Sequence, residues 1–179
     1  MDVDFPVPDG VTPLIDEATI QARVTAMAHA VAEDLGPRFL MVPVLRGSFI
    51  FAADLIRALA RVGALPAVEF VGLESYGDSL ESSGAVHISG RIPPVAGRHV
   101  LLVDDILDTG HTLKEGRRLL EEQGARRVRL ATLLDKPARR EVDVTLDFCG
   151  FDVPDRFVVG YGLDARGAYR GLPCVAALG

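Results

Sequence analysis

Excess positive charge, cysteine and long apolar segments are all missing or scarce in this chain of 179 residues. The formal net charge is −6, so there is no general electrostatic attraction to nucleic acid or to an anionic membrane surface. The two cysteines, Cys149 and Cys174, are far apart and lack the spacing of metal ligands. We therefore expect both to be buried, reduced thiols.

The chain also has no apolar run long enough to cross a bilayer. Its beginning, MDVDFPVPDG, is acidic and contains prolines, unlike a signal peptide. These features predict a soluble, cytoplasmic protein. Repeats, low-complexity segments and domain-scale linkers are absent, and 49% of the residues are hydrophobic. Residues 1–179 are therefore expected to form one domain with a substantial core.

Helical and strand-like segments alternate along the chain. Apolar residues at helical spacing predict helices over residues 16–35, 49–62 and 112–123. Short apolar runs predict strands over residues 39–44, 67–73, 85–89, 100–103, 127–134, 148–151, 157–159 and 175–178. This order predicts an α/β fold with a mostly parallel sheet flanked by helices. We expect the irregular N-terminal arm, residues 1–13, and the C-terminal segments to form a small hood over the strand ends.

The most informative stretch is HVLLVDDILDTGHTL, residues 99–113. A buried strand is followed by the carboxylates Asp104, Asp105 and Asp108, then by a turn at Gly110 and a helix. The N–H groups at a helix start attract phosphate, and glycine lets the backbone approach it closely. Carboxylates repel phosphate, so they would bind sugar hydroxyls, a hard cation or a developing positive charge. A phosphorylated sugar with Mg²⁺ satisfies both halves; an ordinary turn with solvated acids is the alternative.

Two acidic residues, two apolar residues, then Asp-Thr-Gly and Thr resemble the phosphoribosyl pyrophosphate signature of the type I phosphoribosyltransferases. The resemblance implies a fold of that family and a phosphoribosyl-binding loop made of Asp104, Asp105, Ile106, Leu107, Asp108, Thr109, Gly110, His111 and Thr112. It also implies that Asp104 and Asp105 hold the ribose hydroxyls directly or through Mg²⁺, and that Asp108 is the general base. His111 replaces a more usual lysine, arginine or asparagine, and we expect its side chain to point away from the phosphate.

Two further segments resemble parts of the same family. Arg46 and Gly47 lie in a second strand-turn-helix unit that resembles the pyrophosphate-binding loop, in which the peptide before the basic residue is often cis. From the residues alone, a plain surface turn explains this unit equally well. The polar segment 74–84, with Ser75 and Tyr76 near its start, resembles the mobile catalytic loop of hypoxanthine-guanine phosphoribosyltransferases. A long hairpin loop is the alternative.

The last third of the chain extends this resemblance to the purine site. It implies a purine-binding group of Lys136, Arg156, Phe157 and Val158, a metal-associated acid at Asp164 and a pyrophosphate-side arginine at Arg170. Lys136 would donate to the purine 6-oxygen, Phe157 would stack on the ring, and the Val158 backbone would read the base edge. Taken singly, each residue also has an ordinary structural explanation.

The resemblance implies transfer of the 5-phosphoribosyl group from phosphoribosyl pyrophosphate to hypoxanthine and/or guanine. The products would be IMP or GMP and pyrophosphate, with Mg²⁺ as cofactor and a homodimer or homotetramer as the assembly. The alternatives are a xanthine-preferring enzyme and a regulator that senses phosphoribosyl pyrophosphate on the same fold. The acidic chain, with Lys136, Phe157 and Asp164 in place, argues against the regulator. The preference between hypoxanthine and guanine stays open.

Overall fold

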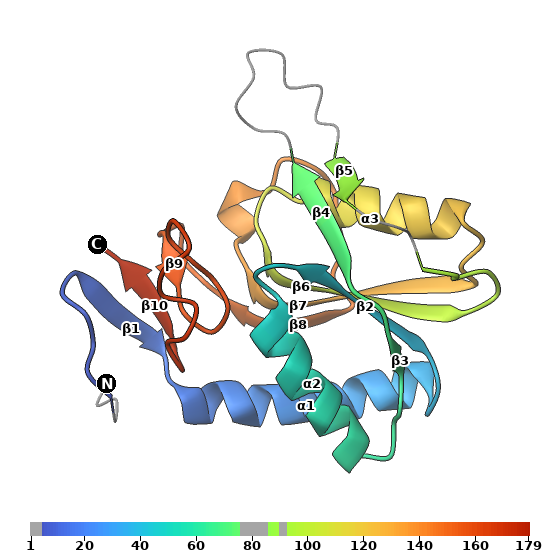
Figure 1. The fold of residues 1–179 in the computed structure, drawn as a ribbon, viewed down its shortest axis with the longest axis horizontal. Coiled ribbons are helices and arrows are strands. Elements are labelled where there is room, and N and C mark those ends of the chain that lie inside the picture. Colours follow the sequence, from blue (N-terminus) through green and yellow to red (C-terminus); the bar gives the residue numbers. More distant parts are fainter. Residues whose placement is uncertain (1–4, 76–85, 90–92) are drawn as a thin grey trace.

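The computed structural model describes residues 5–75, 86–89 and 93–179. Its larger part, here called the body, consists of a sheet and the helices that cover it. The strand order of this sheet is β5-β4-β2-β6-β7-β8, and β3 lies beside β2 (Figure 1). The strands are β2 (Leu40–Leu45), β3 (Ala67–Val68), β4 (Val71–Ser75), β5 (Val86–Ser89), β6 (His99–Leu107), β7 (Arg127–Asp135) and β8 (Phe148–Asp152). All neighbouring strands are parallel except β5, which runs antiparallel to β4. The predicted mostly parallel α/β sheet is confirmed.

Helices cover both faces of this sheet, as its apolar strands require. They are α1 (Glu17–Leu35), α2 (Phe49–Arg61) and α3 (His111–Glu122), with a short 3-10 turn, η1 (Pro137–Arg139), after β7. Alternate residues of the central strands point to opposite faces. Met41 and Leu101 pack in the cluster that contains α1 and α2, whereas Leu40 and Leu102 pack in the cluster that contains α3. Figure 1 shows the two layers on either side of the sheet.

The predicted strand 67–73 is interrupted in the structure. Met41 of β2 pairs with Val68 of β3, and Val44 pairs with Val71 of β4, so the break lies opposite Pro43. Proline has no N–H to donate to a neighbouring strand, and this accounts for the loss of pairing there.

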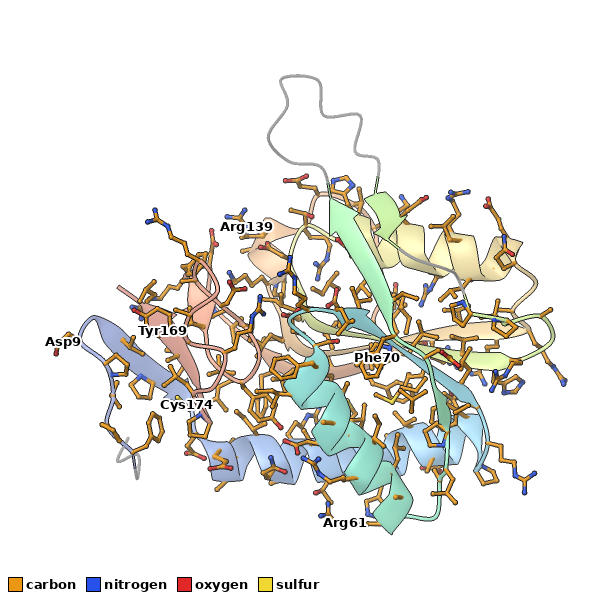
Figure 2. The ribbon with its side chains drawn as sticks, in the orientation of Figure 1. Asp9, Arg61, Phe70, Arg139, Tyr169 and Cys174 are labelled. Atoms are coloured by element: carbon orange, nitrogen blue, oxygen red, sulfur yellow. The ribbon has the colours of Figure 1, made fainter. Side chains whose placement is uncertain are left out.

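The hood is a separate antiparallel sheet of β1 (Val11–Ile15), β10 (Val175–Leu178) and β9 (Val158–Val159). Part of the arm that was predicted to be irregular therefore forms a strand, because β10 supplies backbone partners for Val11 and Thr12. Figure 2 shows Tyr169 and Cys174 within this part. Cys174 is buried as predicted, whereas Cys149 on β8 is only partly buried, and both are free thiols.

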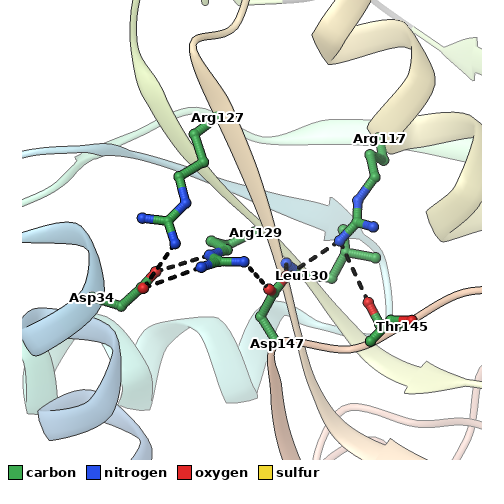
Figure 3. Close-up of polar contacts among 7 residues, drawn as sticks. All are labelled: Asp34, Arg117, Arg127, Arg129, Leu130, Thr145 and Asp147. Carbon is green, nitrogen blue, oxygen red and sulfur yellow. Dashed lines mark hydrogen bonds and ion pairs between the residues drawn. The ribbon is translucent and has the colours of Figure 1, made fainter.

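A network of ion pairs crosses β7 and connects the two helical layers (Figure 3). Arg129 lies between two carboxylates: its Nε is 2.9 Å from Asp34 Oδ2 of α1, and its Nη1 pairs with Asp147. Arg127 Nη2 lies 2.9 Å from Asp34 Oδ1, and Arg117 Nη2 of α3 lies 3.2 Å from Asp147 Oδ2. The network therefore fixes α1, β7 and α3 relative to one another.

Within the described segments, no helix combines the length and apolar character that a membrane span requires.

Candidate active site

Asp104 and Asp105 lie in β6, which is longer than the predicted apolar run and continues to Leu107, and Asp108 follows the end of this strand. The Asp105 N–H donates to Asp104 Oδ1 at 2.9 Å, and the Ile106 N–H donates to Asp105 Oδ1 at 2.8 Å. Asp104 is only 8% exposed. These hydrogen bonds therefore hold two adjacent carboxylates in fixed positions at the end of the strand.

The negative charges of these two buried carboxylates repel each other, and a bound cation would offset the repulsion. Burial raises the pKa of the Asp104 carboxyl well above its usual range, and the negative charge of Asp105 raises it further. Burial raises the pKa of Asp105 as well. A divalent cation near both groups would offset their repulsion, so the donor set suits Mg²⁺, which prefers carboxylate oxygens.

A tight turn connects β6 to α3. Gly110 has φ of +97°, and a Cβ there would lie 3.0 Å from Val142 Cγ2. The Lys114 N–H donates to the Gly110 carbonyl at 3.0 Å, so helical hydrogen bonding starts at this residue. The N–H groups of residues 111–113 consequently have no carbonyl acceptor within the helix, which makes them suitable donors to an anion.

This turn and the second predicted loop share a cleft of about 370 Å³, here called the sugar cleft. It is lined by Val44, Leu45, Arg46, Gly47, Asp104, Asp105, Ile106, Leu107, Asp108, Thr109, Gly110, Thr112 and Leu113. The Leu45–Arg46 peptide is cis, as the resemblance implies. A Cβ at Gly47 would lie 1.6 Å from Asp105 Oδ2, so glycine is required for this close approach. The two sequence-distant loops are thus in direct contact.

A second pocket, here called the base pocket, adjoins the sugar cleft and has a volume of about 220 Å³. It is lined by Asp105, Ile106, Asp108, Lys136, Phe157, Val158, Leu163 and Asp164. Lys136 is 7% exposed and has no ion pair with any described residue, whereas Phe157 is 58% exposed. Asp105 and Asp108 line both cavities, so a group bound in one lies next to a group bound in the other.

Asp108 is held by an arginine that the sequence did not single out. Arg139 Nε donates to Asp108 Oδ1 at 2.8 Å, and its Nη1 lies 3.6 Å from Asp155 Oδ1. The Asp108 charge raises the pKa of Arg139. Arg140 donates to the Asp108 carbonyl and pairs with Asp135. The only available signal was the pair of arginines that closely follows Lys136 at the end of β7. Figure 2 places Arg139 on the side of the body that faces the hood.

Some predicted site residues lie outside both cavities. His111 Nε2 is 3.0 Å from Glu141 Oε2, and the ring does not line the sugar cleft, in agreement with the expectation that it points away. Arg156 is exposed and does not line the base pocket. Ser75 is the last residue of β4, and Tyr76 lies outside the described residues, as does most of the predicted mobile loop.

Arg170 lines neither cavity but supports the wall of the base pocket. Its Nη1 donates to the Gly162 carbonyl at 2.5 Å, and its Nη2 lies 2.5 Å from Asp164 Oδ1. The Gly167 N–H donates to Asp164 Oδ2 at 2.6 Å. Leu163, which the sequence analysis did not select, is brought into the base pocket by the same turn.

A sheet with an acidic strand end, an amide-lined turn and an adjoining pocket is the arrangement that a sugar-phosphate transferase requires, and comparison with known families agrees with this class. The family profile described as "Phosphoribosyl transferase domain" matches residues 16–166, and the chain belongs to this family. Hypoxanthine phosphoribosyltransferase of Salmonella typhimurium is 42% identical over 166 residues, which cover 90% of this chain and 92% of that protein. Hypoxanthine-guanine phosphoribosyltransferase of Bacillus subtilis is 40% identical, with 92% and 91% covered.

Solved structures show the same similarity in three dimensions. A hypoxanthine phosphoribosyl transferase of Trypanosoma cruzi matches with a TM-score of 0.92 at 32% identity, over 98% of this chain and 95% of that one. A hypoxanthine-guanine phosphoribosyltransferase of Bacillus anthracis matches with a TM-score of 0.87 at 36% identity, over 97% and 100%. The fold of this family therefore extends over almost the whole chain.

Proposed function

We propose that the protein transfers the 5-phosphoribosyl group from phosphoribosyl pyrophosphate to hypoxanthine and/or guanine, giving IMP or GMP and pyrophosphate in purine salvage. The observation that carries this proposal is the common wall of the sugar cleft and the base pocket, where Asp108 lies. A reaction that joins a sugar to a base needs the two ligands side by side, and a carboxylate on the wall between them can take the proton that the base loses. The names of the relatives support the same substrates.

The sugar cleft would hold the phosphoribosyl group and the leaving pyrophosphate. The N–H groups at the start of α3 and the hydroxyls of Thr109 and Thr112 would bind the 5-phosphate. Arg46 and the backbone beside Gly47 would bind the pyrophosphate and stabilise the negative charge that develops as it leaves. Asp104 and Asp105 would hold the ribose hydroxyls. Arg170 supports the turn at Gly162 and Asp164 in the wall of the base pocket, and we expect it to affect pyrophosphate binding through this turn.

Asp104 and Asp105 are also the residues that we propose for Mg²⁺, since their buried, mutually repelling carboxylates match its preference for oxygen ligands. When bound, Mg²⁺ would neutralise the developing charge on pyrophosphate. We propose Asp164 as an acid associated with a second metal, and its contacts with the Gly167 N–H and Arg170 would hold its carboxylate in place.

Asp108 would take the proton from N7 of the purine as general base. Arg139 holds its Oδ1, which leaves the orientation of the carboxylate fixed and Oδ2 available to the base. Fixing a general base in this way removes part of the entropic cost of the proton transfer.

Lys136 would select 6-oxopurines. Its ammonium group is buried in the base pocket, so it can donate to a purine oxygen, but it cannot accept a hydrogen bond from an adenine amino group. Adenine would leave this buried charge unpaired, which is costly. Phe157, exposed at the rim of the pocket, would stack on the purine, and Val158 would contact the base edge through its backbone. Arg156 remains a predicted purine-binding residue.

We further propose that the protein acts in the cytoplasm as a homodimer or homotetramer and that Ser75 and Tyr76 belong to a loop that closes over the substrates. A loop that excludes water would protect the activated sugar from hydrolysis.

The proposal is tested by incubating the purified protein with phosphoribosyl pyrophosphate, Mg²⁺ and a panel of hypoxanthine, guanine, xanthine and adenine. We expect pyrophosphate release with hypoxanthine or guanine and little with adenine. Xanthine as the best substrate would favour the xanthine-preferring alternative. Binding of phosphoribosyl pyrophosphate without turnover of any base would favour the regulator.

A further inference from the structure

A buried tyrosine connects the hood to both helices on one face of the body. Tyr161 follows β9, has φ of +51° and is 3% exposed. Its hydroxyl donates to Asp54 Oδ2 of α2. Gln21 of α1 donates through Nε2 to the same Asp54 oxygen at 2.8 Å and to the Tyr161 hydroxyl at 3.3 Å. This cluster fixes the Tyr161 ring and, with it, the backbone of the next residue.

The next residue, Gly162, touches the loop that we assign to pyrophosphate. A Cβ at Gly162 would lie 2.1 Å from the Gly47 carbonyl oxygen, and a Cβ at Gly47 would lie 1.6 Å from Asp105 Oδ2. Gly162, Gly47 and Asp105 are therefore stacked in direct succession from the hood into the sugar cleft. A small displacement of Gly162 would be passed to Gly47, because no space separates them.

The side of this turn that faces the base pocket has supports of its own. The Gly160 N–H donates to the Leu163 carbonyl at 3.0 Å, and the Leu163 N–H donates to the Gly160 carbonyl at 3.1 Å. Val158 and Val159 are held by pairing with β10. On the other side of the turn, Gly162 donates its N–H to the Arg170 carbonyl at 3.0 Å and accepts from Arg170 Nη1 at 2.5 Å, and the Tyr161 hydroxyl adds an anchor to α2. Loss of the Tyr161 hydroxyl removes this second anchor and leaves the supports of the base side intact.

We propose that Tyr161 is a positioning residue for the pyrophosphate-binding loop, because its hydrogen bond to Asp54 holds Gly162 against Gly47. This inference rests on the proposed function, since it assigns the Arg46–Gly47 loop to pyrophosphate. Tyr161 touches no substrate itself and does not line either cavity. Its effect on the reaction passes through the contact of Gly162 with Gly47, which the hydrogen bonds from Arg170 to Gly162 also support.

The test is Tyr161→Phe, which keeps the ring and removes only the hydroxyl. We expect the KM for phosphoribosyl pyrophosphate to rise ~5-fold, with kcat and the KM for hypoxanthine within ~2-fold of the wild type. The dissociation constant for pyrophosphate with Mg²⁺, measured by calorimetry without a base, should rise by a similar factor. Tyr169→Phe is the matched control, because Tyr169 is also a hood tyrosine with positive φ and has no hydroxyl hydrogen bond to a described residue.

Variants at Asp54 separate positioning from general stability. Asp54→Ala removes the acceptor and should reproduce the rise in KM, whereas Asp54→Asn keeps an oxygen acceptor and should restore most of the wild-type value. Tyr161→Phe combined with Asp54→Ala should be no worse than either variant alone, because both remove the same bond. These Asp54 variants decide the matter if Tyr161→Phe does not fold.

A lower melting temperature with unchanged affinity for both phosphoribosyl pyrophosphate and pyrophosphate would overturn the inference and leave Tyr161 a structural residue. An equal rise in the KM for both substrates would overturn it as well. Failure of the wild-type protein to turn over any base would count against the proposed function instead, and the calorimetric comparison would still test the loop.

Discussion

Replacing Asp104 by asparagine should stabilise the ligand-free protein while damaging its activity. Asp104 is buried beside a second acid, and burial and the Asp105 charge together raise its pKa. Asparagine keeps the size of the side chain and an oxygen that can accept the Asp105 N–H. The substitution therefore removes the repulsion and the cost of burying a charge, and it keeps the hydrogen bond.

The magnitude follows from elementary electrostatics. At an effective dielectric constant of about 20, two unit charges on adjacent buried side chains repel by about 3 kcal/mol. The hydrogen bond from the Asp105 N–H weakens by about 1 kcal/mol when its acceptor loses its charge. The free energy of unfolding should thus rise by about 2 kcal/mol, which corresponds to ~4–8 °C in Tm for a chain of this size.

The gain must depend on pH. A carboxyl whose pKa is raised on folding binds its proton more readily in the folded state, so the folded state loses stability as pH rises from about 3.9, the unfolded value, through the folded pKa. The difference in Tm between Asp104→Asn and wild type should therefore be large at pH 8 and small near pH 4.

The assay is calorimetric unfolding in EDTA at several pH values, with the exposed Asp143→Asn as the matched control. Addition of Mg²⁺ should stabilise the wild type more than Asp104→Asn, because the variant retains only one of the two carboxylates that we propose as metal ligands. A Tm that falls in the variant, or a gain that does not change with pH, would refute the electrostatic argument.

Four other predictions concern single side chains. Asp108→Asn should keep the fold and lower kcat ~10²-fold or more, because an amide cannot take the purine proton; wild-type turnover would remove Asp108 as the base. Lys136→Gln should narrow the preference for hypoxanthine over adenine in kcat/KM by ~10-fold or more, and an unchanged ratio would argue against its contact with the 6-oxygen. Arg139→Gln, which releases Asp108 Oδ1, should lower kcat more than the KM for either substrate; Arg139→Lys should recover part of it, and an unaltered kcat would show that the ion pair does not orient the base. Arg129→Leu should lower the free energy of unfolding by about 1–2 kcal/mol, because Asp34 and Asp147 lose their shared partner, and an unchanged Tm would show that Arg127 and Arg117 suffice.

Local sequence patterns predicted most of the strands and helices of the body, because each central strand is a short apolar run and each helix has apolar residues at helical spacing. The apolar run before Asp104 is a buried strand, and the helix after Gly110 begins where the turn residues indicate. The pairing of strands that lie far apart in the sequence was harder to predict. The strand at Val11 depends on β10, and the break opposite Pro43 depends on which strands are neighbours. Neither can be read from a short window of sequence.

The same distinction applies to the site. The acids at the end of β6 were recognisable because the motif is contiguous, whereas the role of Lys136 was predicted from the resemblance to the family. Arg139 was not, since its contact with Asp108 bridges two loops and the residues have no fixed spacing. Arg156, next to Phe157 in the sequence, is exposed and lines neither cavity, so its predicted contact with the purine has no support from the geometry of the base pocket.

The stacking of Gly162 on Gly47, and of Gly47 on Asp105, has a consequence for how freely this chain can vary. A library that places all amino acids at each glycine, selected for purine-dependent growth, should retain glycine alone at positions 47 and 162. Gly171, where a Cβ would meet no atom within 4 Å, should accept many replacements. The close contacts at these two glycines thus restrict the amino acids that the positions can accept. This restriction is stricter than in most of the hydrophobic core, where one apolar side chain can often replace another.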